Sequence, residues 1–494
     1  RIRFTVVLVL HLAKIEVMLV ALSLYLVFLR ACFAWRGTLS APGQRITQSY
    51  DAEFVRGPSK TLAQFLFSLG SGASASNARA SSRKFHPRAS VVASPSLVRA
   101  TSWDDLASHL PEEGAKADAV LTLYRDNNGW CPFCERILLT LERKQIPFRE
   151  ELIDLRNKPQ WYKDMIPTEL VPAIKMHDSG KIVFESLEIM SYLDEKFPDT
   201  ETLLQPQADI SAALERNDAL LTAGFRFAYG VRNASLSDAE KADRKATFMQ
   251  AMGDLDASLS SGGPFIAGAN MSAADICLIP MMERYRYQLP LQAGVEVYDG
   301  KWPGIKHWFD AMDADPSYSD KVAGDATSWT LVTSTFLRLF ASNADGGIDA
   351  DTQQIIDKAD KAAENLLEQA AASSQASELT SHRAAITAAR KLIANHAAVV
   401  ADACAGDGEP KSQKTLQRLP PSASEVVDQV LKNAAARLLG VEPTPVSRER
   451  APEAARGARF VATRICAPRD MGAPAAAALR RMLFLEEAAA QVMM

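Results

Sequence analysis

Apolar residues follow two different periods between positions 101 and 204, which predicts strands alternating with helices. Alternating or unbroken apolar runs, typical of strands, lie at 119–124, 148–153, 172–176 and 181–184. Apolar residues at helical spacing, with proline opening two of the segments, lie at 132–144, 159–165 and 186–196. With a short helix at 103–110 capped by Ser102, this region predicts an α/β unit of order βαβαββα.

Helical spacing then continues, without strands, to position 440. The first four helical segments are separated by glycine or proline and lie at 208–229, 238–260, 272–289 and 303–314. Further apolar stripes follow, and there Ser422 with Glu425 predicts a helix start and Gly440 its end. We therefore expect an all-helical unit over 205–340 and a helical extension over 345–440.

The two ends of the chain differ in composition from the middle. Residues 441–494 are rich in Arg, Pro and Ala, which predicts a mostly disordered tail with one Ala-rich helix at 474–491. Thirteen uncharged residues at 17–29 predict a signal peptide over 1–34, with a membrane anchor as the alternative. Residues 35–100 hold nine Lys or Arg and two acids, which is typical of a transit peptide, with a disordered linker as the alternative.

These two N-terminal segments together resemble the bipartite presequence of algae with secondary plastids. We therefore expect delivery to a plastid, with the secretory pathway or the cytoplasm as alternatives.

Charge and cysteine content narrow the function classes. The 55 Lys and Arg nearly balance the 59 Asp and Glu, and the net charge of −4 argues against nucleic acid or an anionic membrane as a general partner. Six cysteines in 494 residues are too few for a disulfide scaffold. Two of them, Cys131 and Cys134, lie three positions apart directly after the first predicted strand.

Cys131 is predicted to lie at a helix N-terminus, where free backbone N–H groups and the helix dipole stabilise a thiolate. Cys134 lies one turn further in, where it is less exposed and able to resolve a disulfide. The same spacing fits half of a zinc site or an inert buried pair. No second Cys or His pair has ligand spacing, so we expect a redox pair or a thiol nucleophile and no metal.

Two further dipeptides suit a peptide-like ligand. Val171-Pro172 precedes a strand as a cis-proline does in thioredoxin-like folds, which would let the Val171 backbone pair with an extended peptide. Glu185-Ser186 opens a helix whose N–H groups and serine hydroxyl would hold a carboxylate, while Glu185 would accept from an ammonium. A plain helix cap is the alternative interpretation of Glu185 and Ser186.

Several motifs occur in a fixed order. In the α/β unit they are Gly129-Trp130-Cys131-Pro132-Phe133-Cys134-Glu135-Arg136, Asn157-Lys158-Pro159-Gln160-Trp161, Leu170-Val171-Pro172 and Phe184-Glu185-Ser186. In the helical half they are Pro264-Phe265-Ile266-Ala267-Gly268 and Met271-Ser272-Ala273-Ala274-Asp275-Ile276. With this ordered set, residues 119–335 resemble the cytosolic-type glutathione S-transferase superfamily. The most similar branches are the cysteine-containing ones: omega-class transferases, plant dehydroascorbate reductases and intracellular chloride channel proteins.

The resemblance implies a thioredoxin-like, glutathione-binding domain over 101–204 and the all-α C-terminal domain of a glutathione S-transferase over 205–340. Glutathione would be a co-substrate, with Cys131 and Cys134 as the catalytic residues. The implied glutathione-binding residues are Phe133, Lys158, Val171, Pro172, Glu185 and Ser186.

The bound tripeptide would lie extended across the first domain. Its sulfur would face Cys131, its cysteinyl backbone would pair with Val171, and its γ-glutamyl end would meet Glu185 and Ser186. Lys158 matches a family lysine near the glycyl carboxylate, although a solvated surface lysine is the alternative. The second substrate would lie between the domains, beside aromatic residues that fit a plain core equally well: Phe225, Phe227, Tyr229 and Tyr285.

The family pattern implies a glutathione-dependent thiol transferase or dehydroascorbate reductase, with a small oxidised or disulfide substrate. Cys131 would form a mixed disulfide with glutathione. Cys134 stands where omega enzymes and dehydroascorbate reductases usually have another residue, so Cys-Pro-Phe-Cys is glutaredoxin-like and strictly monothiol chemistry is not implied. The alternative is a non-catalytic binding or assembly subunit. The extension over 345–440, which we expect to dock away from Cys131, would then meet a second copy or a protein partner.

Overall fold

The computed structural model describes residues 102–112, 118–204, 207–230, 236–341, 347–374, 381–406 and 417–494. The targeting segments predicted over 1–34 and 35–100 lie outside these residues. None of the helices within the described ranges is long and apolar enough to cross a lipid bilayer.

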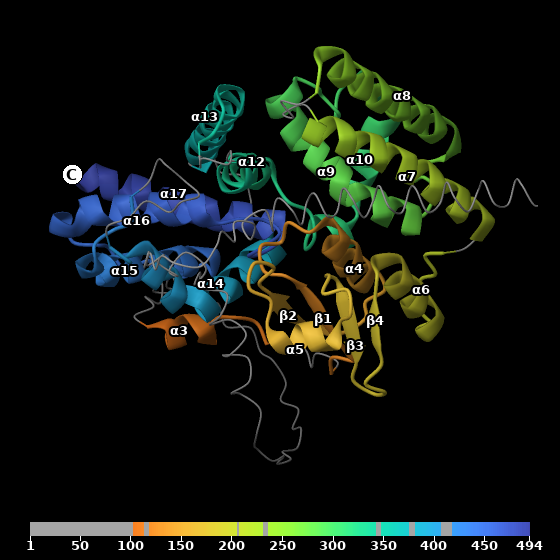
Figure 1. Cartoon of the computed structure of the whole chain (residues 1–494). Helices are drawn as coiled ribbons and strands as arrows, with labels where there is room; N and C mark the ends of the chain where they lie inside the picture. The colour runs from red at the N-terminus through yellow and green to blue at the C-terminus, as the bar shows by residue number, and fades with distance from the viewer. Residues whose placement is uncertain are drawn as a thin grey trace, which may run out of the picture.

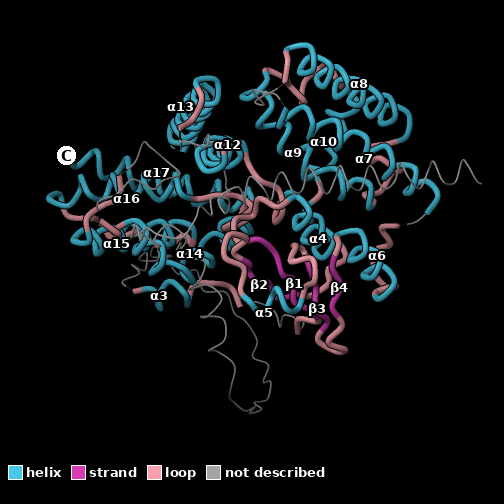
Figure 2. The backbone as a smooth tube through the Cα atoms, in the orientation of Figure 1, coloured by secondary structure: helices cyan, strands magenta, loops and turns pink. Residues whose placement is uncertain are grey.

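A four-stranded mixed sheet forms the centre of the α/β domain (Figure 2). Its strands are β1 (Leu121–Asp126), β2 (Phe148–Ile153), β3 (Ala173–Met176) and β4 (Ile182–Phe184), in the spatial order β2-β1-β3-β4. β1 pairs parallel with β2, with Leu121 opposite Phe148, and antiparallel with β3. The predicted order βαβαββα is confirmed, and this is the thioredoxin-like half of the fold.

Helices cover both faces of this sheet. α4 (Pro132–Arg143) and α6 (Ser186–Lys196) pack on one face, where Leu123 and Ile174 join Ile137 and Ile189 in the main core. On the other face, Tyr124 and Ala173 pack against α5 (Gln160–Met165). The sheet thereby fixes the start of α4, which follows directly from β1.

The second half of the fold is helical, as expected. Its helices are α7 (Gln207–Gly230), α8 (Asp238–Gly262), α9 (Ala273–Ala293), α10 (Pro303–Ala314), α11 (Pro316–Ser319), α12 (Ala326–Phe340) and α13 (Ala350–Ser374). α9 starts at the predicted capping box: the Ser272 N–H donates to Asp275 Oδ2 at 2.9 Å. The same buried carboxylate accepts from the Ile266 N–H and from the Trp308 indole, both at 2.8 Å. Asp275 therefore joins the start of α9 to α10.

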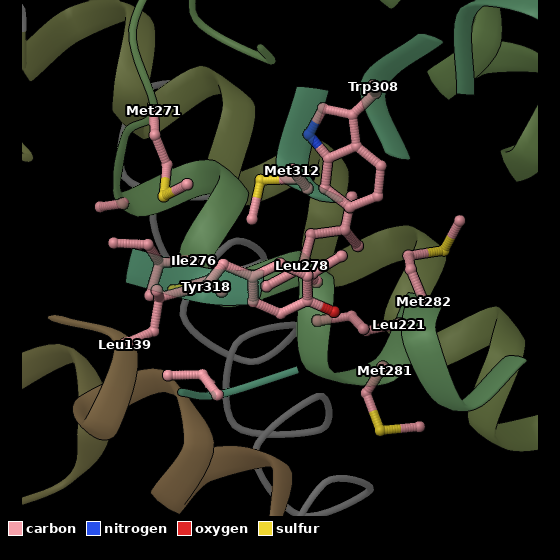
Figure 3. Close-up of a cluster of buried hydrophobic side chains, with 14 of the residues drawn as sticks. Leu139, Leu221, Met271, Ile276, Leu278, Met281, Met282, Trp308, Met312 and Tyr318 are labelled. Atoms are coloured by element: carbon pink, nitrogen blue, oxygen red, sulfur yellow. The ribbon is translucent and has the colours of Figure 1, made fainter. Parts of the chain in front are cut away.

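A continuous core unites the two halves. Figure 3 shows Leu139 of α4 facing α9 residues Ile276 and Leu278, with Trp308 and Met312 of α10 beyond them. Trp308 and Leu278 are fully buried. The helix that carries Cys131 is therefore anchored in the all-α half as well as on the sheet.

The last helices form a second packed unit, on the opposite side of the molecule from α7, α8 and α10 (Figure 1). They are α14 (His382–Ala403), α15 (Ser424–Leu438), α16 (Ala451–Arg464) and α17 (Ala473–Met493). The short α3 (Trp103–Ser108) belongs to the same unit, because the Trp103 indole stacks on His396 at 4.1 Å and donates to Asp428 at 2.9 Å. We call α3 with α14–α17 the bundle.

The bundle corrects the expectation for residues 441–494. α17 confirms the Ala-rich helix predicted at 474–491, but the rest of the segment is not mostly disordered, because it contains α16. The two helices pack against each other and against α15. Alanine side chains make this packing work: Ala454, Ala458 and Ala476 are almost fully buried. Small side chains let helices approach closely, and the composition argument missed this because alanine adds little to an apolar stripe.

Candidate active site

Cys131 is the N-cap residue of α4, as the sequence predicts. Its backbone is extended, Pro132 occupies the first turn, and its Sγ accepts a hydrogen bond from the Cys134 N–H at 3.4 Å. The Cys131 side chain is half-buried. The predicted position of Cys131 at the start of this helix is therefore confirmed.

Cys134 lies beneath it and is only 2% exposed. Burial raises the pKa of the Cys134 thiol well above its usual value, and the neighbouring Cys131 and Asp126 raise it further. The two cysteines thus occupy unequal environments, and the prediction that Cys134 is the less exposed one is confirmed.

The peptide bond between Val171 and Pro172 is cis, and it brings a carbonyl to the cysteine. Cys131 Sγ lies 4.0 Å from the Val171 carbonyl oxygen. Val171 is 8% exposed and packs with Tyr124 and Tyr162, next to the half-buried Cys131. The start of β3 therefore forms one wall beside the thiol.

The N-terminus of α6 forms the next part of the site. Glu185 is exposed, has a positive φ of 67°, and makes no capping hydrogen bond through its side chain. Ser186 is buried and accepts from Arg136 Nη1 at 3.4 Å, while the Arg136 guanidinium stacks on Phe133 at 4.8 Å. Ser186 is the first residue of α6 rather than its cap, so it links α6 to α4 through Arg136.

The remaining predicted residues lie in two different settings. Lys158 is half-buried in the loop between β2 and α5. Of the aromatic residues, Phe227 and Tyr285 are both 2% exposed, and both pack on Phe248 with ring centroids 5.3 and 5.5 Å away. These two belong to the core of the all-α half, not to a substrate surface. Phe225 is partly buried against the same core, and the Tyr229 side chain lies outside the described set.

Sequence reasoning missed Asp126, which ends β1. Its Oδ2 accepts from the Trp130 N–H at 2.8 Å and the Cys131 N–H at 3.3 Å, so it holds the loop that leads into Cys131. A carboxylate five positions before the cysteine was a visible signal, but only the bend of the loop brings the two together.

A buried charge network beneath the loop was also missed. Arg284 of α9 donates to Glu135 at 2.9 Å and to the Trp130 carbonyl at 3.0 Å. Burial raises the pKa of Glu135 to about 8, although the Arg284 charge acts in the opposite direction. Nothing in the local sequence pairs these residues, since 149 positions separate Glu135 from Arg284.

The bundle reaches this loop through residues 441–494, the segment that the sequence analysis expects to be a mostly disordered tail. Gly129 has φ +67°, and a Cβ there would lie 3.1 Å from the Arg469 Cα, in the turn between α16 and α17. In the same turn, the Ala467 N–H donates to Ser328 Oγ of α12 at 2.9 Å. On α12 itself, Phe336 packs edge-on against Trp130 at 6.4 Å. The α16–α17 turn and α12 are therefore neighbours of the loop that leads into Cys131. That residues 345–440 dock away from Cys131 stays a prediction.

The comparisons with known proteins agree with this geometry. Residues 130–196 match the family model described as the glutathione S-transferase N-terminal domain. A rice protein, "Probable glutathione S-transferase DHAR1, cytosolic", is 32% identical over 168 residues, which are 34% of this chain and 71% of the relative. The chain belongs to the glutathione S-transferase superfamily, and to its dehydroascorbate reductase or omega-like type.

Two more matches extend the comparison. The Arabidopsis thaliana protein "Glutathione S-transferase DHAR3, chloroplastic" is 27% identical over 193 residues, which are 39% of this chain and 69% of that protein. The crystal structure of glutathione transferase Omega 3C from Trametes versicolor is 25% identical, with a TM-score of 0.36, and covers 44% of this chain and 89% of that one. Its family membership identifies the protein as an enzyme of the glutathione transferase and oxidoreductase type.

Proposed function

We propose that this glutathione S-transferase is a glutathione-dependent thiol transferase of the dehydroascorbate reductase type, with Cys131 as the nucleophile. The observation that carries the proposal is the position of Cys131 as the half-buried N-cap of α4, beside the Val171 carbonyl. Cys134, Cys277 and Cys404 are buried, so they lack the access that a substrate disulfide requires.

Glutathione is the proposed co-substrate, held along the edge of the site by residues of four segments. Val171 and Pro172 at the start of β3 would pair with its cysteinyl backbone, and Phe133 would support its sulfur end. The exposed carboxylate of Glu185 suits the γ-glutamyl ammonium, and the N-terminus of α6 at Ser186 suits its carboxylate. Lys158, in the loop before α5, would attract the glycyl carboxylate.

The proposed chemistry transfers glutathione between sulfurs. The Cys131 thiolate attacks the glutathione sulfur of a mixed disulfide, the S–S bond breaks, and the substrate leaves as a thiolate that takes a proton from water. A second glutathione, as thiolate, attacks the Cys131–glutathione disulfide, which releases glutathione disulfide and restores Cys131. Dehydroascorbate would be reduced at the same cysteine, with two glutathione molecules supplying the two electrons.

The test compares matched serine variants of the full chain. Cys131→Ser should abolish both the reduction of a glutathione mixed disulfide and that of dehydroascorbate, whereas Cys134→Ser should keep most of both. Intact and peptide mass spectrometry after mixing with glutathione disulfide should place the adduct on Cys131. A Cys131→Ser protein with undiminished turnover overturns the proposal, and a native protein inactive with both substrates favours a non-catalytic binding subunit.

The glutathione site has its own test. Glu185→Ala should weaken glutathione binding by about 1.5–3 kcal/mol, because one charge-assisted hydrogen bond is lost. Glu188→Ala, one turn further along α6 and also exposed, is the matched control and should leave the affinity unchanged. Calorimetry that finds equal affinity for native protein and Glu185→Ala removes Glu185 from the site.

We also propose that residues 1–100 deliver the enzyme to a plastid, which the serine- and arginine-rich composition supports. A fluorescent protein fused behind residues 1–100 in an alga with secondary plastids should enter the plastid. Retention in the secretory pathway, or diffuse cytoplasmic signal, would contradict this localisation.

A further inference from the structure

One peptide bond, which joins Trp130 to Cys131, is held on both of its sides. Its carbonyl oxygen accepts from Arg284 Nη2 at 3.0 Å, and its N–H donates to Asp126 Oδ2 at 3.3 Å. Arg284 belongs to α9 of the all-α half, whereas Asp126 ends β1 of the sheet. Because the two halves of the fold hold the same peptide bond, the backbone that carries Cys131 has little freedom to rotate.

The Arg284 guanidinium is itself fixed by three further contacts. Its Nη1 donates to Glu135 Oε2 at 2.9 Å and to the Pro280 carbonyl, and the group lies over the Trp329 ring at 4.3 Å. Arg284 is only 6% exposed, so water hardly competes for its donors. A rigid guanidinium fork holds several acceptors in one plane, which a lysine ammonium cannot do.

Trp329 comes from α12 and is bound to the residue that precedes Arg284. Its indole N–H donates to Glu283 Oε1, which also accepts from the Gly324 N–H at 2.6 Å. The Tyr318 hydroxyl donates to the other oxygen of the same carboxylate. Glu283 therefore fixes the start of α12 to α9 and places the Trp329 ring beneath the guanidinium.

We propose that Arg284 is a positioning residue for the reaction of Cys131, with Trp329 as its support. By holding the Trp130 carbonyl, Arg284 sets the direction from which the Cys131 sulfur meets a disulfide. It acts through the Trp130–Cys131 peptide bond and serves neither as an acid nor as a base. This inference rests on the proposed thiol-transferase function and deepens it.

Direction matters more for disulfide exchange than for a simpler reaction of the same sulfur. The Cys131 sulfur must align with the S–S bond of a substrate that is held by other segments: the start of β3, the start of α6 and the loop before α5. A small alkylating reagent is not held by the protein and approaches the sulfur from any open side. The two reactions therefore separate the position of the sulfur from its accessibility.

The experiment measures both rates in the full chain: exchange with a glutathione mixed disulfide, and alkylation by iodoacetamide, with Cys131 confirmed by peptide mass spectrometry as the site. The main variant joins Arg284→Met to Glu135→Gln, so that no carboxylate loses its ion-pair partner. Its exchange rate should fall on the order of a hundredfold, because the sulfur is misplaced. Its alkylation rate should change far less. Glu135→Gln alone keeps the fork on the Trp130 carbonyl and should slow exchange much less than the double variant does.

The matched control is another arginine of α9. Arg286 pairs with Asp313 at 2.9 Å and lies over the Tyr298 ring at 3.9 Å. Arg286→Met removes the same charge and should leave both rates of Cys131 native. If Arg284 only stabilises the fold, its variant melts earlier but keeps the native ratio of exchange to alkylation, and that result overturns the inference.

Two single variants decide the question if the double variant does not fold. Trp329→Leu removes the aromatic support without removing a charge, and it should lower the ratio of exchange to alkylation by less than the double variant would. Arg284→Lys keeps the charge without the fork and should also lower this ratio. A native ratio in either variant overturns the inference and leaves the proposed function standing. If the native protein shows no exchange at Cys131, the proposed function itself fails, and the inference fails with it.

Discussion

Two regions of the molecule fill their interiors with different side chains: the body, which comprises the four-stranded sheet and α4–α13, and the bundle. The core shared by the sheet and α7–α10 is built from bulky residues such as Trp308, Phe248 and Met282, and its few alanines are Ala223, Ala228, Ala273 and Ala323. In the core of the bundle, half of the buried residues are alanine. Bulky side chains leave a clear apolar stripe in a sequence, whereas alanine allows close helix contact without one.

The two regions also differ in how they contribute to the site. The body supplies the cysteines, the Val171 carbonyl and the buried Arg284 network. The bundle supplies no group that touches Cys131 among the described contacts, but its α16–α17 turn packs on Gly129, two positions before that cysteine. A region with no place in the simple family pattern is therefore packed against the loop that leads into Cys131.

The largest expected effect comes from removing α13 together with α14–α17 of the bundle. A chain that ends at Ser342 loses the Ala467 and Arg480 donors to Ser328 and the cover over Trp103 and Leu106. We expect it to be insoluble or to melt well below the full chain, measured by calorimetry.

The control for that truncation is a chain that begins at residue 111 and also ends at Ser342, so that α3 is removed together with the helices that cover it. If the exposed apolar side chains of α3 contribute to the loss of stability, the chain that lacks α3 should be more soluble than the chain that keeps it. A soluble chain ending at Ser342 with the native melting temperature and native Cys131 reactivity would show that the bundle is an independent appendage.

The second prediction tests the contact between the regions. Gly129→Ala places a Cβ 3.1 Å from the Arg469 Cα and forces a positive φ on alanine. The positive φ costs about 1–2 kcal/mol, and the clash adds about 1–3 kcal/mol. Denaturant unfolding measures the loss, and alkylation of Cys131 should slow because the loop shifts.

Gly180→Ala is the matched control, since Gly180 has the same φ of +67° but no atom within 4 Å of the added Cβ. It should show only the backbone cost and leave Cys131 unaffected. Equal losses in the two variants would mean that the α16–α17 turn does not constrain the loop that leads into Cys131.

The sequence predicted the body far better than the bundle, and the reason is physical. The four strands, α4 to α6 and the N-cap position of Cys131 follow from local periodicity, proline and the cysteine motif. The contacts of Asp126 with Cys134, Arg284 with Glu135 and Arg469 with Gly129 depend on which distant segments meet. The disordered-tail prediction failed because alanine and arginine composition does not reveal that Ala458 and Ala476 are buried.

The third prediction concerns pH. Burial raises the pKa of Glu135 in the body to about 8, whereas in the bundle the Arg469 charge lowers the pKa of Asp470 despite its burial. A raised carboxyl pKa stabilises the fold below the unfolded value of 4.5, and this contribution is lost as the pH rises towards 8. Melting temperatures should therefore fall between pH 5 and pH 8.5.

Glu135→Gln should flatten that pH dependence, because the amide does not titrate. Asp470→Asn lowers stability overall but should keep the slope, since Asp470 is ionised in both the folded and the unfolded protein above pH 5. If Asp470→Asn removes the slope and Glu135→Gln keeps it, the titrating group lies in the bundle and not in the body.

The smallest effect is expected within the bundle itself. Gly457 lies on α16, and a Cβ there would approach Val427 Cγ2 of α15 to 2.9 Å. Alanine in place of a helical glycine gains about 1 kcal/mol, while the clash with the stiff valine costs about 1–3 kcal/mol. The free energy of unfolding should fall by up to about 2 kcal/mol.

Gly253→Ala on α8 is the matched control. The nearest atom to the added Cβ is 3.7 Å away there, so this variant should instead stabilise the protein. In the Gly457→Ala background, Val427→Ala should cost less than it does alone, with a coupling of about 0.5–3 kcal/mol. Additive effects would show that α15 and α16 are looser than their alanine-rich contact indicates.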